Sequence, residues 1–277
     1  MVSKHTVTMR SRGIGSQLLD LLFPPRCQVC GEFSDDSLCE TCRETLLFID
    51  APRCTCCGRP LPAGEFAPSP GTLCEECRDG RWVSGARSVG PHLGTLRDAM
   101  LAYKFAGRRR LAELFGEMLA EVFAREVAGP ERGLPLERCA ALVPVPLHPK
   151  RRHWRGFDQA ELLCEHITEA LGLPVWDDAI ARIRHTTPQT ELTGASRRAN
   201  VRGAFEARKP WRLARASVVL VDDVMTTGST LEECARVLKT AGARSVYALT
   251  VTRAVPGWHT IRPGGEGAPP AGGDMDA

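Results

Sequence analysis

The chain has 277 residues, of which 43% are hydrophobic and 25% charged, and its formal net charge is +3. This composition is typical of a globular enzyme with one large core and a small additional module. No segment approaches the roughly 18 apolar residues that a membrane-spanning helix needs, so no membrane span is expected.

Four regions are predicted along the chain. Residues 1–22 form a basic tail with a short helix, and they contain neither a long apolar segment nor a small-residue cleavage site. We therefore expect no signal peptide and a cytoplasmic location. Residues 23–80 form a cysteine-rich module and residues 81–255 form the main domain. Residues 256–277 are rich in Gly, Pro and Ala, and we expect a disordered tail there.

Cysteine pairs dominate the second region. Nine of the twelve cysteines precede residue 80, and the segments RCQVCG and LCETCR are repeated as RCTCCG and LCEECR. This internal duplication contains four Cys-x-x-Cys pairs: Cys27/Cys30, Cys39/Cys42, Cys54/Cys57 and Cys74/Cys77. Two such turns complete a tetrahedral tetrathiolate zinc site, so the duplication predicts two structural Zn²⁺ ions.

The simplest assignment shares the pairs in sequence, with the first two pairs on one ion and the last two on the other. Interleaved sharing remains an alternative. A disulfide framework and an iron–sulfur cluster are less favoured readings of the same cysteines. Cys56 is interpreted as a non-ligand, and Cys139, Cys164 and Cys234 as small buried thiols.

The main domain begins with apolar positions at helical spacing, which predict helices over Leu96–Phe105 and Leu111–Val127. A buried strand is predicted over Ala140–Val145, followed by a loop in which four cations occupy the six positions from Lys150 to Arg155. A helix is then predicted from Asp158 to about Leu171, with Gly172 as its stop.

A long polar segment, Arg184–Asn200, follows this helix and includes Thr187, Gln189, Thr190 and Arg197. Such a segment is typical of a mobile flap over an active site, although an ordinary surface excursion is an alternative.

The most informative segment is VVLVDDVMTTGST, residues 218–230. Val218–Val221 predicts a strand buried on both faces, with Asp222 and Asp223 at its carboxyl end, where ligands bind in open α/β sheets. Thr226, Thr227, Gly228, Ser229 and Thr230 then supply N–H groups and hydroxyls where a helix over Thr230–Thr240 begins, a place suited to phosphate. Gly242 ends that helix, and Val246–Val251 returns as a parallel strand.

This segment resembles the signature of type I phosphoribosyltransferases, which bind phosphoribosyl pyrophosphate (PRPP). The resemblance implies an α/β fold with a parallel sheet flanked by helices. It also implies that Asp222 and Asp223 hold the ribose hydroxyls and that Thr226–Thr230 wraps the 5′-phosphate. The plain alternative is a buried strand followed by an Asx-type turn and a Ser/Thr helix cap.

PRPP also carries a pyrophosphate, which needs positive charge. We expect at least one of Lys150, Arg151 and Arg155 to bind it, because guanidinium and ammonium groups suit phosphate oxygens. A solvated basic loop or a nucleic-acid contact would contain the same residues. Mg²⁺ is expected to accompany PRPP.

Four segments occur in the order seen in the ComF family. They are YKFAGR, VPVPLHPKRRHWRGFDQAELL, Arg184–Phe205 with TPQTEL and RRANVRGAF, and VVLVDDVMTTGST. The chain resembles this family over roughly Cys27 to Thr252. The resemblance implies an amino-terminal zinc ribbon joined to a phosphoribosyltransferase domain, and a link to DNA uptake in natural competence.

Two functions follow as hypotheses. The first is transfer of phosphoribosyl from PRPP to a nitrogenous acceptor, with Asp222 or Asp223 assisting proton transfer. The second is a PRPP-sensing adaptor that binds single-stranded DNA or a competence helicase through Arg108–Arg110, Lys150–Arg155 and the rings of Trp82, Trp154 and Phe157. A net charge of +3 supports the second only weakly.

Overall fold

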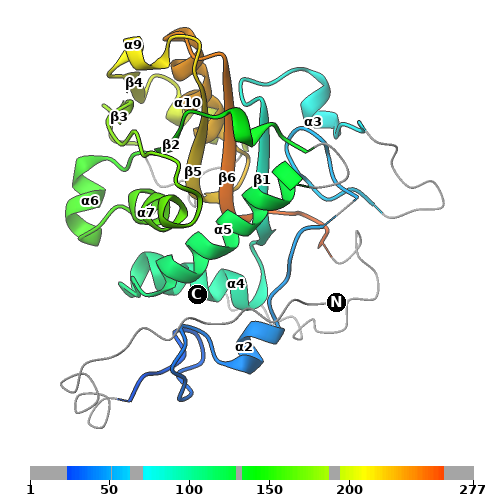
Figure 1. Cartoon of the computed structure of the whole chain (residues 1–277), viewed down its shortest axis with the longest axis vertical. Coiled ribbons are helices and arrows are strands. Elements are labelled where there is room, and N and C mark those ends of the chain that lie inside the picture. The colour runs from blue at the N-terminus through cyan, green and yellow to red at the C-terminus, as the bar shows by residue number, and fades with distance from the viewer. Residues whose placement is uncertain (1–23, 51, 63–70, 129–132, 187–193, 259–277) are drawn as a thin grey trace.

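A four-stranded parallel sheet lies at the centre of the molecule (Figure 1). The structure, a computed structural model, describes residues 24–50, 52–62, 71–128, 133–186 and 194–258. The strand order is β1-β6-β5-β2, with β1 at Gly85–Pro91, β6 at Ser245–Arg253, β5 at Ser217–Met225 and β2 at Ala141–Pro144. All neighbouring strands run parallel, which confirms the predicted sheet type.

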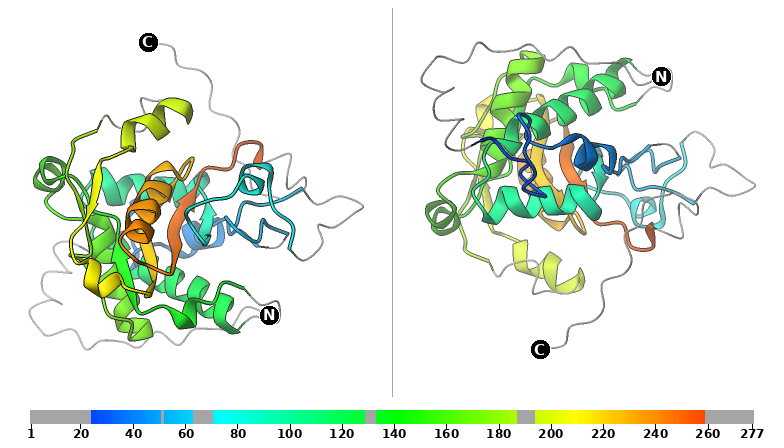
Figure 2. Two further views of the ribbon diagram at one scale, coloured as in Figure 1. Left: turned by 90° about the horizontal axis from the view of Figure 1, so that it is seen from above. Right: turned by 90° about the horizontal axis from the view of Figure 1, so that it is seen from below.

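Helices cover both faces of this sheet (Figures 1 and 2). The helices α5 (Leu111–Ala128) and α7 (Gln159–Leu171) cover one face, and α10 (Ser229–Thr240) covers the other. Successive side chains of a strand point to opposite faces. Accordingly, Val219 and Val221 pack with α5 and α7, whereas Val218 and Leu220 pack with α10. These four side chains are fully buried, as the apolar run predicted.

A second, two-stranded sheet stands beside the main one. It pairs β3 (Ile180–Arg182) with β4 (Phe205–Ala207) in antiparallel orientation. Between them lies α8 (Gly194–Val201), in the segment predicted to be a flap, and α9 (Pro210–Leu213) follows β4. Thr187, Gln189 and Thr190 lie outside the described residues. The remaining elements of the main domain are α4 (Gly94–Phe105), η1 (Leu136–Arg138) and α6 (Pro149–Arg155).

Two elements differ from the prediction in more than their end residues. The basic segment predicted as a loop is the helix α6, because Pro149 fits the first helical position and His148 Nδ1 accepts the N–H of Lys150. Gly156, at φ 75°, ends it. The strand β5 does not stop at Val221 but continues to Met225, because its pairing with β6 extends that far. The cap of α7 is confirmed, since the Asp158 carboxylate accepts the N–H groups of Ala160 and Glu161.

The two repeats of the cysteine-rich module lie at different places (Figures 1 and 2). The first contains α2 (Glu40–Glu44) and packs Leu38 and Leu46 into the core formed by α4, α5 and their neighbours. The second contains α3 (Glu75–Arg78) and lies beside β1, where the N–H of Ala86 donates to the carbonyl of Cys56.

The described chain includes only the first three residues of the predicted carboxyl-terminal tail, 256–258. Trp258, which was assigned to the disordered tail, is buried against Ile49 and Val255. The rest of that tail, residues 259–277, and the whole of residues 1–22 lie outside the described residues.

A buried ion-pair network joins the second repeat to the main domain. The carboxylate of Glu126 on α5 is 1% exposed and contacts the guanidinium groups of Arg53 and Arg87. Arg87 Nε lies 2.9 Å from Glu126 Oε2, and the side chain of Arg87 also donates to the carbonyls of Thr55 and Cys56. The same carboxylate accepts the N–H of Leu134. Glu126 therefore provides negative charge to two arginines at the junction.

Replacing Glu126 should destabilise the fold strongly, because Glu126→Ala leaves the buried Arg87 without a counter-charge. We expect the free energy of unfolding to fall by about 3 kcal/mol, measured by urea denaturation. Asp98→Ala is the matched control, because the Asp98–Arg97 pair is exposed on both sides. An exposed pair contributes at most about 1 kcal/mol. Equal losses in the two variants would contradict the role of Glu126.

Candidate functional site

The acidic pair of β5 lies at the carboxyl edge of the sheet. Because side chains alternate along a strand, Asp222 and Asp223 face opposite sides. Asp223 Oδ1 lies 2.9 Å from the ammonium of Lys104, near the end of α4. Asp222 Oδ1 accepts the N–H of Asp223 at 2.8 Å. Lys104 belongs to the YKFAGR segment, but no role at this site was predicted for it from the sequence.

The electrostatics of this edge favour a bound cation or hydroxyl donors. Burial, together with the neighbouring Asp223 carboxylate, raises the pKa of Asp222 to about 8. His92, which follows β1, has its pKa lowered by burial and by the charge of Lys104. Its Nδ1 lies 3.0 Å from Thr252 Oγ1 of β6. Hydroxyls that donate to Asp222, or a cation beside it, would stabilise the ionised carboxylate.

The predicted phosphate loop, Thr226–Thr230, connects β5 to α10. Gly228 adopts φ 77° and precedes the first helical residue, Ser229, one position earlier than predicted. A Cβ at Gly228 would lie 2.9 Å from Met225 Cε, the movable end of a flexible side chain, so the turn requires glycine for its φ. The hydroxyls of Thr227 and Ser229 lie 2.6 Å apart. The loop therefore presents hydroxyls and backbone N–H groups at the start of a twelve-residue helix.

A pocket of about 540 Å³ opens beside this loop. Its wall contains loop residues, the segment after the second cysteine repeat, and parts of α8 and α10. The charged residues in the wall are Arg81, Arg198, Arg202, Glu232, Glu233 and Arg236. Four arginines against two glutamates give the pocket an excess of positive charge, which suits an anionic ligand next to Thr227 and Ser229.

The three basic residues predicted to bind pyrophosphate have different surroundings. Arg151 donates to the carbonyl of Thr186, at the end of the segment that follows β3. Arg155 instead donates to Gln159 Oε1, and its guanidinium lies 5.3 Å from the ring centroid of Phe105. Lys150 is exposed. Of the three, Arg151 is thus the one with a hydrogen bond to the segment that follows β3.

Arg182, which the sequence analysis missed, lies near Arg151. Its side chain donates to the hydroxyl of Thr186. Burial, and then the charge of Arg151, lower the pKa of Arg182, whereas Asp222 raises it. Two guanidinium groups are therefore gathered on the side of the sheet edge that Asp222 faces. The folding of β3 against β4 brings Arg182 to the side of the sheet edge that Asp222 faces. The sequence around Arg182 therefore did not indicate that it lies near the candidate site.

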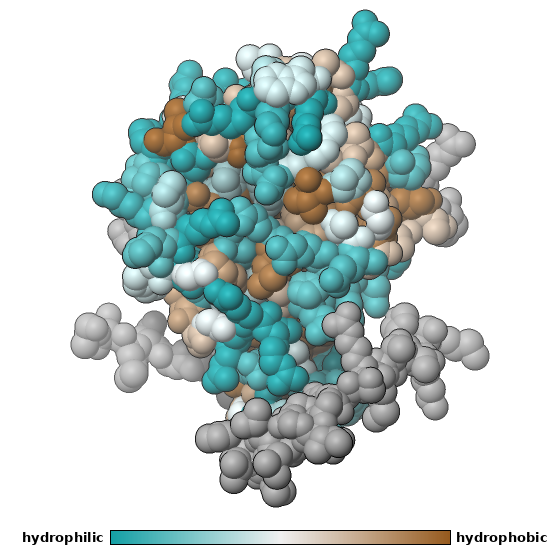
Figure 3. All heavy atoms as spheres, turned by 60° about the vertical axis from the view of Figure 1, so that its left-hand side comes forward, coloured by the Kyte–Doolittle hydropathy of each residue, from teal (hydrophilic) through white to brown (hydrophobic). Residues whose placement is uncertain are grey.

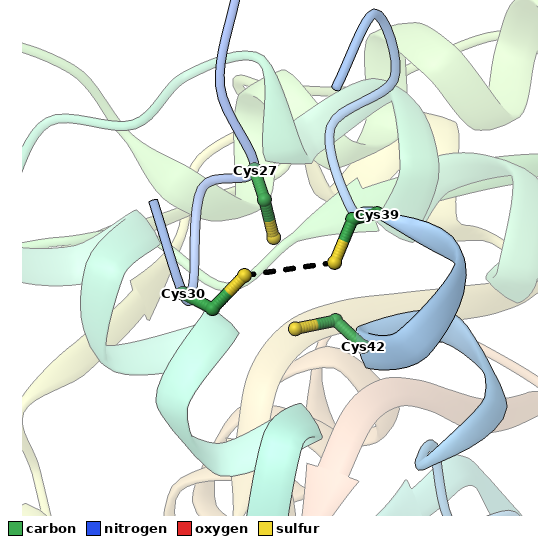
Figure 4. A group of neighbouring side chains, drawn as sticks. All are labelled: Cys27, Cys30, Cys39 and Cys42. Atoms are coloured by element: carbon green, nitrogen blue, oxygen red, sulfur yellow. Dashed lines mark hydrogen bonds between the residues drawn. The ribbon is translucent and has the colours of Figure 1, made fainter. Parts of the chain in front are cut away.

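The eight paired cysteines form two clusters, and in each the four sulfur atoms lie within 4.8 Å of one another. The first cluster is Cys27, Cys30, Cys39 and Cys42, and the second is Cys54, Cys57, Cys74 and Cys77. Figure 4 shows the four side chains of the first cluster pointing to a common centre. The grouping follows the sequential assignment, and four converging thiolates fit a structural zinc ion.

The four remaining cysteines are members of neither cluster. Cys56 belongs to neither, although it is next to Cys57 in sequence. Cys139, Cys164 and Cys234 are buried, as predicted.

Zinc content should report on the clusters separately. The purified protein is expected to hold two zinc ions per chain, and Cys42→Ser should reduce this to one because three thiolates close a tetrahedral site poorly. Elemental analysis after gel filtration measures the content. Cys56→Ser, which changes a neighbouring thiol outside both clusters, should keep two ions. Two zinc ions per chain in Cys42→Ser would exclude Cys42 as a zinc ligand.

Comparison with known proteins supports both parts of this arrangement. The double zinc ribbon family matches residues 18–78, and the phosphoribosyl transferase domain family matches residues 159–258. Among solved structures, glutamine PRPP amidotransferase from B. subtilis is 20% identical, with a TM-score of 0.33, over 52% of this chain and 26% of that one. A likeness that slight carries no argument. Within the described residues, no helix is both long and apolar enough to cross a membrane.

Two curated relatives extend over most of the chain. The DNA utilization protein YhgH of Salmonella typhimurium is 32% identical, covering 78% of this chain and 96% of its own length. The competence protein ComFC of Bacillus subtilis is 27% identical, covering 79% and 85%. With a double zinc ribbon followed by a phosphoribosyltransferase domain, and with these relatives, the chain belongs to the ComF family.

Proposed function

We propose that the protein binds PRPP with Mg²⁺ at the carboxyl edge of the sheet and transfers the phosphoribosyl group to a nitrogenous acceptor. One observation carries this proposal: the acidic pair near the end of β5 is followed, after Val224 and Met225, by a hydroxyl-rich turn at the start of α10, beside a pocket with excess positive charge. A polyol bearing a phosphate has matching groups in the same order.

Each part of the edge has a proposed role. Thr226, Thr227, Gly228, Ser229 and Thr230 hold the 5′-phosphate through N–H groups and hydroxyls. Asp222 and Asp223 accept hydrogen bonds from the ribose hydroxyls. Lys150, Arg151 and Arg155 are the proposed pyrophosphate ligands, and among them Arg151 has the strongest support because it lies beside Arg182.

The donor set also suits Mg²⁺, which prefers carboxylate and phosphate oxygens. Asp222 and Asp223 would hold it together with the substrate, and its charge would stabilise the departing pyrophosphate. In the proposed reaction the bond from ribose C1 to pyrophosphate breaks, and a bond from the acceptor nitrogen to C1 forms. The acceptor nitrogen loses a proton, which Asp222 or Asp223 can accept. The protein contributes positioning and charge rather than a covalent nucleophile.

Calorimetric titration with PRPP and Mg²⁺ tests this proposal. The wild-type protein should bind, and Asp222→Asn combined with Asp223→Asn should weaken binding by about a hundredfold, because two charged acceptors of ribose hydroxyl bonds are lost at about 1.5 kcal/mol or more each. Asp98→Asn on α4 is a control for the loss of an exposed carboxylate. Equal affinity in the double variant would refute the pocket. Absence of binding to the wild type would favour the second candidate below.

A second candidate function rests on a surface formed by Phe105, Arg109, Trp154, Arg155 and Phe157, of which Arg155 is also a proposed pyrophosphate ligand. The rings of Trp154 and Phe105 are 71% and 59% exposed, and their centroids lie 6.5 Å apart. Arg109 donates to the carbonyl of Gly156, and its guanidinium lies 4.7 Å from the centroid of the Phe157 ring. The fold thus joins the run Arg108–Arg110 to α6.

Exposed rings among arginines suit single-stranded DNA, since bases stack on aromatic faces and phosphates pair with guanidinium groups. The side of the molecule that carries α6, β3 and β4 is mostly hydrophilic (Figure 3). Trp82, the other ring considered, is 48% exposed but lines the pocket beside the phosphate loop. We propose this surface as a contact for single-stranded DNA in the cytoplasm or for a competence protein such as a helicase, compatible with the names of the relatives.

Trp154→Ala should weaken binding of a labelled oligothymidylate about tenfold, since stacking of one base contributes about 1–3 kcal/mol. Fluorescence anisotropy at several salt concentrations measures the affinity and its electrostatic part. Trp211→Ala is the matched control, because Trp211 is 70% exposed but lies on α9. Equal effects of the two substitutions, or no binding by the wild type, would argue against this surface.

A further inference from the structure

The second cysteine cluster is in contact with two arginines that do not belong to the cysteine-rich repeat. Arg81 Nη1 lies 3.8 Å from Cys77 Sγ. Arg253, the last residue of β6, donates to the carbonyl of Cys57, and its Nη2 lies 3.9 Å from Cys57 Sγ. A zinc ion with four thiolates carries an excess of negative charge, so guanidinium groups at the sulfur atoms stabilise the site and are held by it.

Arg81 connects this cluster to the carboxyl side of the phosphate loop. Its Nε lies 2.6 Å from Glu232 Oε1, in the first turn of α10. The N–H of Glu232 donates to the carbonyl of Gly228 at 2.9 Å. Arg81 Nη2 also lies only 3.5 Å from where a Cβ on Gly228 would be. The guanidinium therefore packs against the glycine of the loop while it bridges a sulfur and a carboxylate.

Arg253 connects the same cluster to the amino side of the loop. In the sheet it is paired with Met225, the residue before Thr226. The N–H of the next residue, Ala254, donates to the carbonyl of Met225 at 2.9 Å. Met225 in turn lies against Gly228. Arg81 thus contacts the carboxyl side of the loop and Arg253 the amino side. Both guanidinium groups also contact sulfur atoms of the second cluster.

The first cluster is placed differently. Its repeat contacts α4 and the turn before α5, where Ser37 donates to the carbonyl of Arg110 and the hydroxyls of Thr45 and Thr95 lie 2.7 Å apart. Among the residues that the structure describes, its cysteine side chains make no hydrogen bond or ion pair with β5, the phosphate loop or α10. The duplicated sequence has therefore produced two sites with different neighbours.

We propose that the second zinc site positions the phosphate loop through Arg81 and Arg253, whereas the first zinc site only stabilises its own repeat. Loss of metal from the second site loosens the loop and weakens the binding of a phosphorylated ligand. By thermodynamic reciprocity, a ligand on the loop raises the affinity of the second site for its metal. We expect this higher affinity to appear as slower release of the ion. The effect on ligand affinity rests on the proposed PRPP site, but the effect on loop mobility does not.

The test uses the zinc-loaded full chain and two arginine variants. Arg81→Met removes the link to α10. Arg59→Met is its matched control, because Arg59 pairs with Glu76 beside the same cluster and, within the described residues, has no ion pair with α10. Hydrogen–deuterium exchange follows the amides from Met225 to Glu233, and calorimetry follows PRPP affinity. In Arg81→Met we expect about tenfold faster exchange and about tenfold weaker PRPP binding, with both unchanged in Arg59→Met.

Glu232→Gln is a second variant, which weakens the same link from the side of α10 without touching the cluster. If Arg81→Met loses zinc or fails to fold, Glu232→Gln replaces it as the test of the link. We expect the same faster exchange of the loop amides in Glu232→Gln. The proposal is overturned if the loop amides of a folded Arg81→Met exchange at the wild-type rate. If Arg81→Met does not fold, an unchanged exchange rate in Glu232→Gln overturns it. Faster exchange in a protein that binds no PRPP would refute the proposed function and leave the coupling intact.

Metal release provides an independent reading. With a zinc-binding dye as competitor, PRPP should slow the release of one of the two ions. The slowing should persist in Cys42→Ser, which retains the second site, and disappear in Cys77→Ser, which retains the first. Equal slowing in the two variants, or slowing confined to Cys77→Ser, would contradict the assignment of the coupling to the second site.

Discussion

The parallel pairing of β5 with β2 on one side and β6 on the other determines where every group of the candidate site lies. Parallel strands bring their carboxyl ends to one edge, so the acidic pair, the phosphate loop and the segment after β2 meet there. The pairing depends on an apolar run that is buried on both faces, because α5 and α7 cover one face and α10 the other. A charged residue within Val218–Val221 would therefore disturb the core and the site together.

The cysteine-rich repeats follow a different physical logic. Each is too small to fold by hydrophobic burial alone, and metal ligation supplies what burial cannot. Their contacts with the main domain are mixed. The first repeat packs Leu38 and Leu46 into the main core, whereas the second is attached through Arg53, Arg87 and Glu126 and through Arg253. The cysteines of the second repeat also pack into the core cluster of Val218 and Leu220, and its ion pairs add contacts that a single charge change can remove.

Local sequence signals were sufficient for much of this structure. The apolar run of β5, the Asp158 cap of α7 and the repeated Cys-x-x-Cys pairs each carry a signal within a few residues, and the corresponding features were predicted correctly. The errors were also local. Pro149 and His148 can begin a helix, but the density of charge after them suggested a loop, and the acidic pair suggested a strand end where pairing with β6 extends β5 to Met225.

The residues that escaped prediction share a physical reason. Lys104, Arg182, Arg81 and Arg253 acquire their roles from partners far away in sequence, such as Asp223 for Lys104 and Glu232 for Arg81. An isolated arginine or lysine gives no indication of which carboxylate or sulfur it will meet. Single-sequence reasoning therefore proposes ligand-binding groups from a motif, and it misses the residues that contact the motif from distant parts of the chain.

The contact between Cys57 and Arg253 spans 196 positions of the chain, and β1 pairs within the described sheet only with β6. During translation, the second repeat leaves the ribosome and can acquire metal long before its partner strand is synthesised. Until then, β1 is an unpaired edge beside a metal-loaded repeat, and such edges promote aggregation. Chaperone binding at β1 would therefore protect the growing chain from aggregation during the interval between the synthesis of β1 and that of β6.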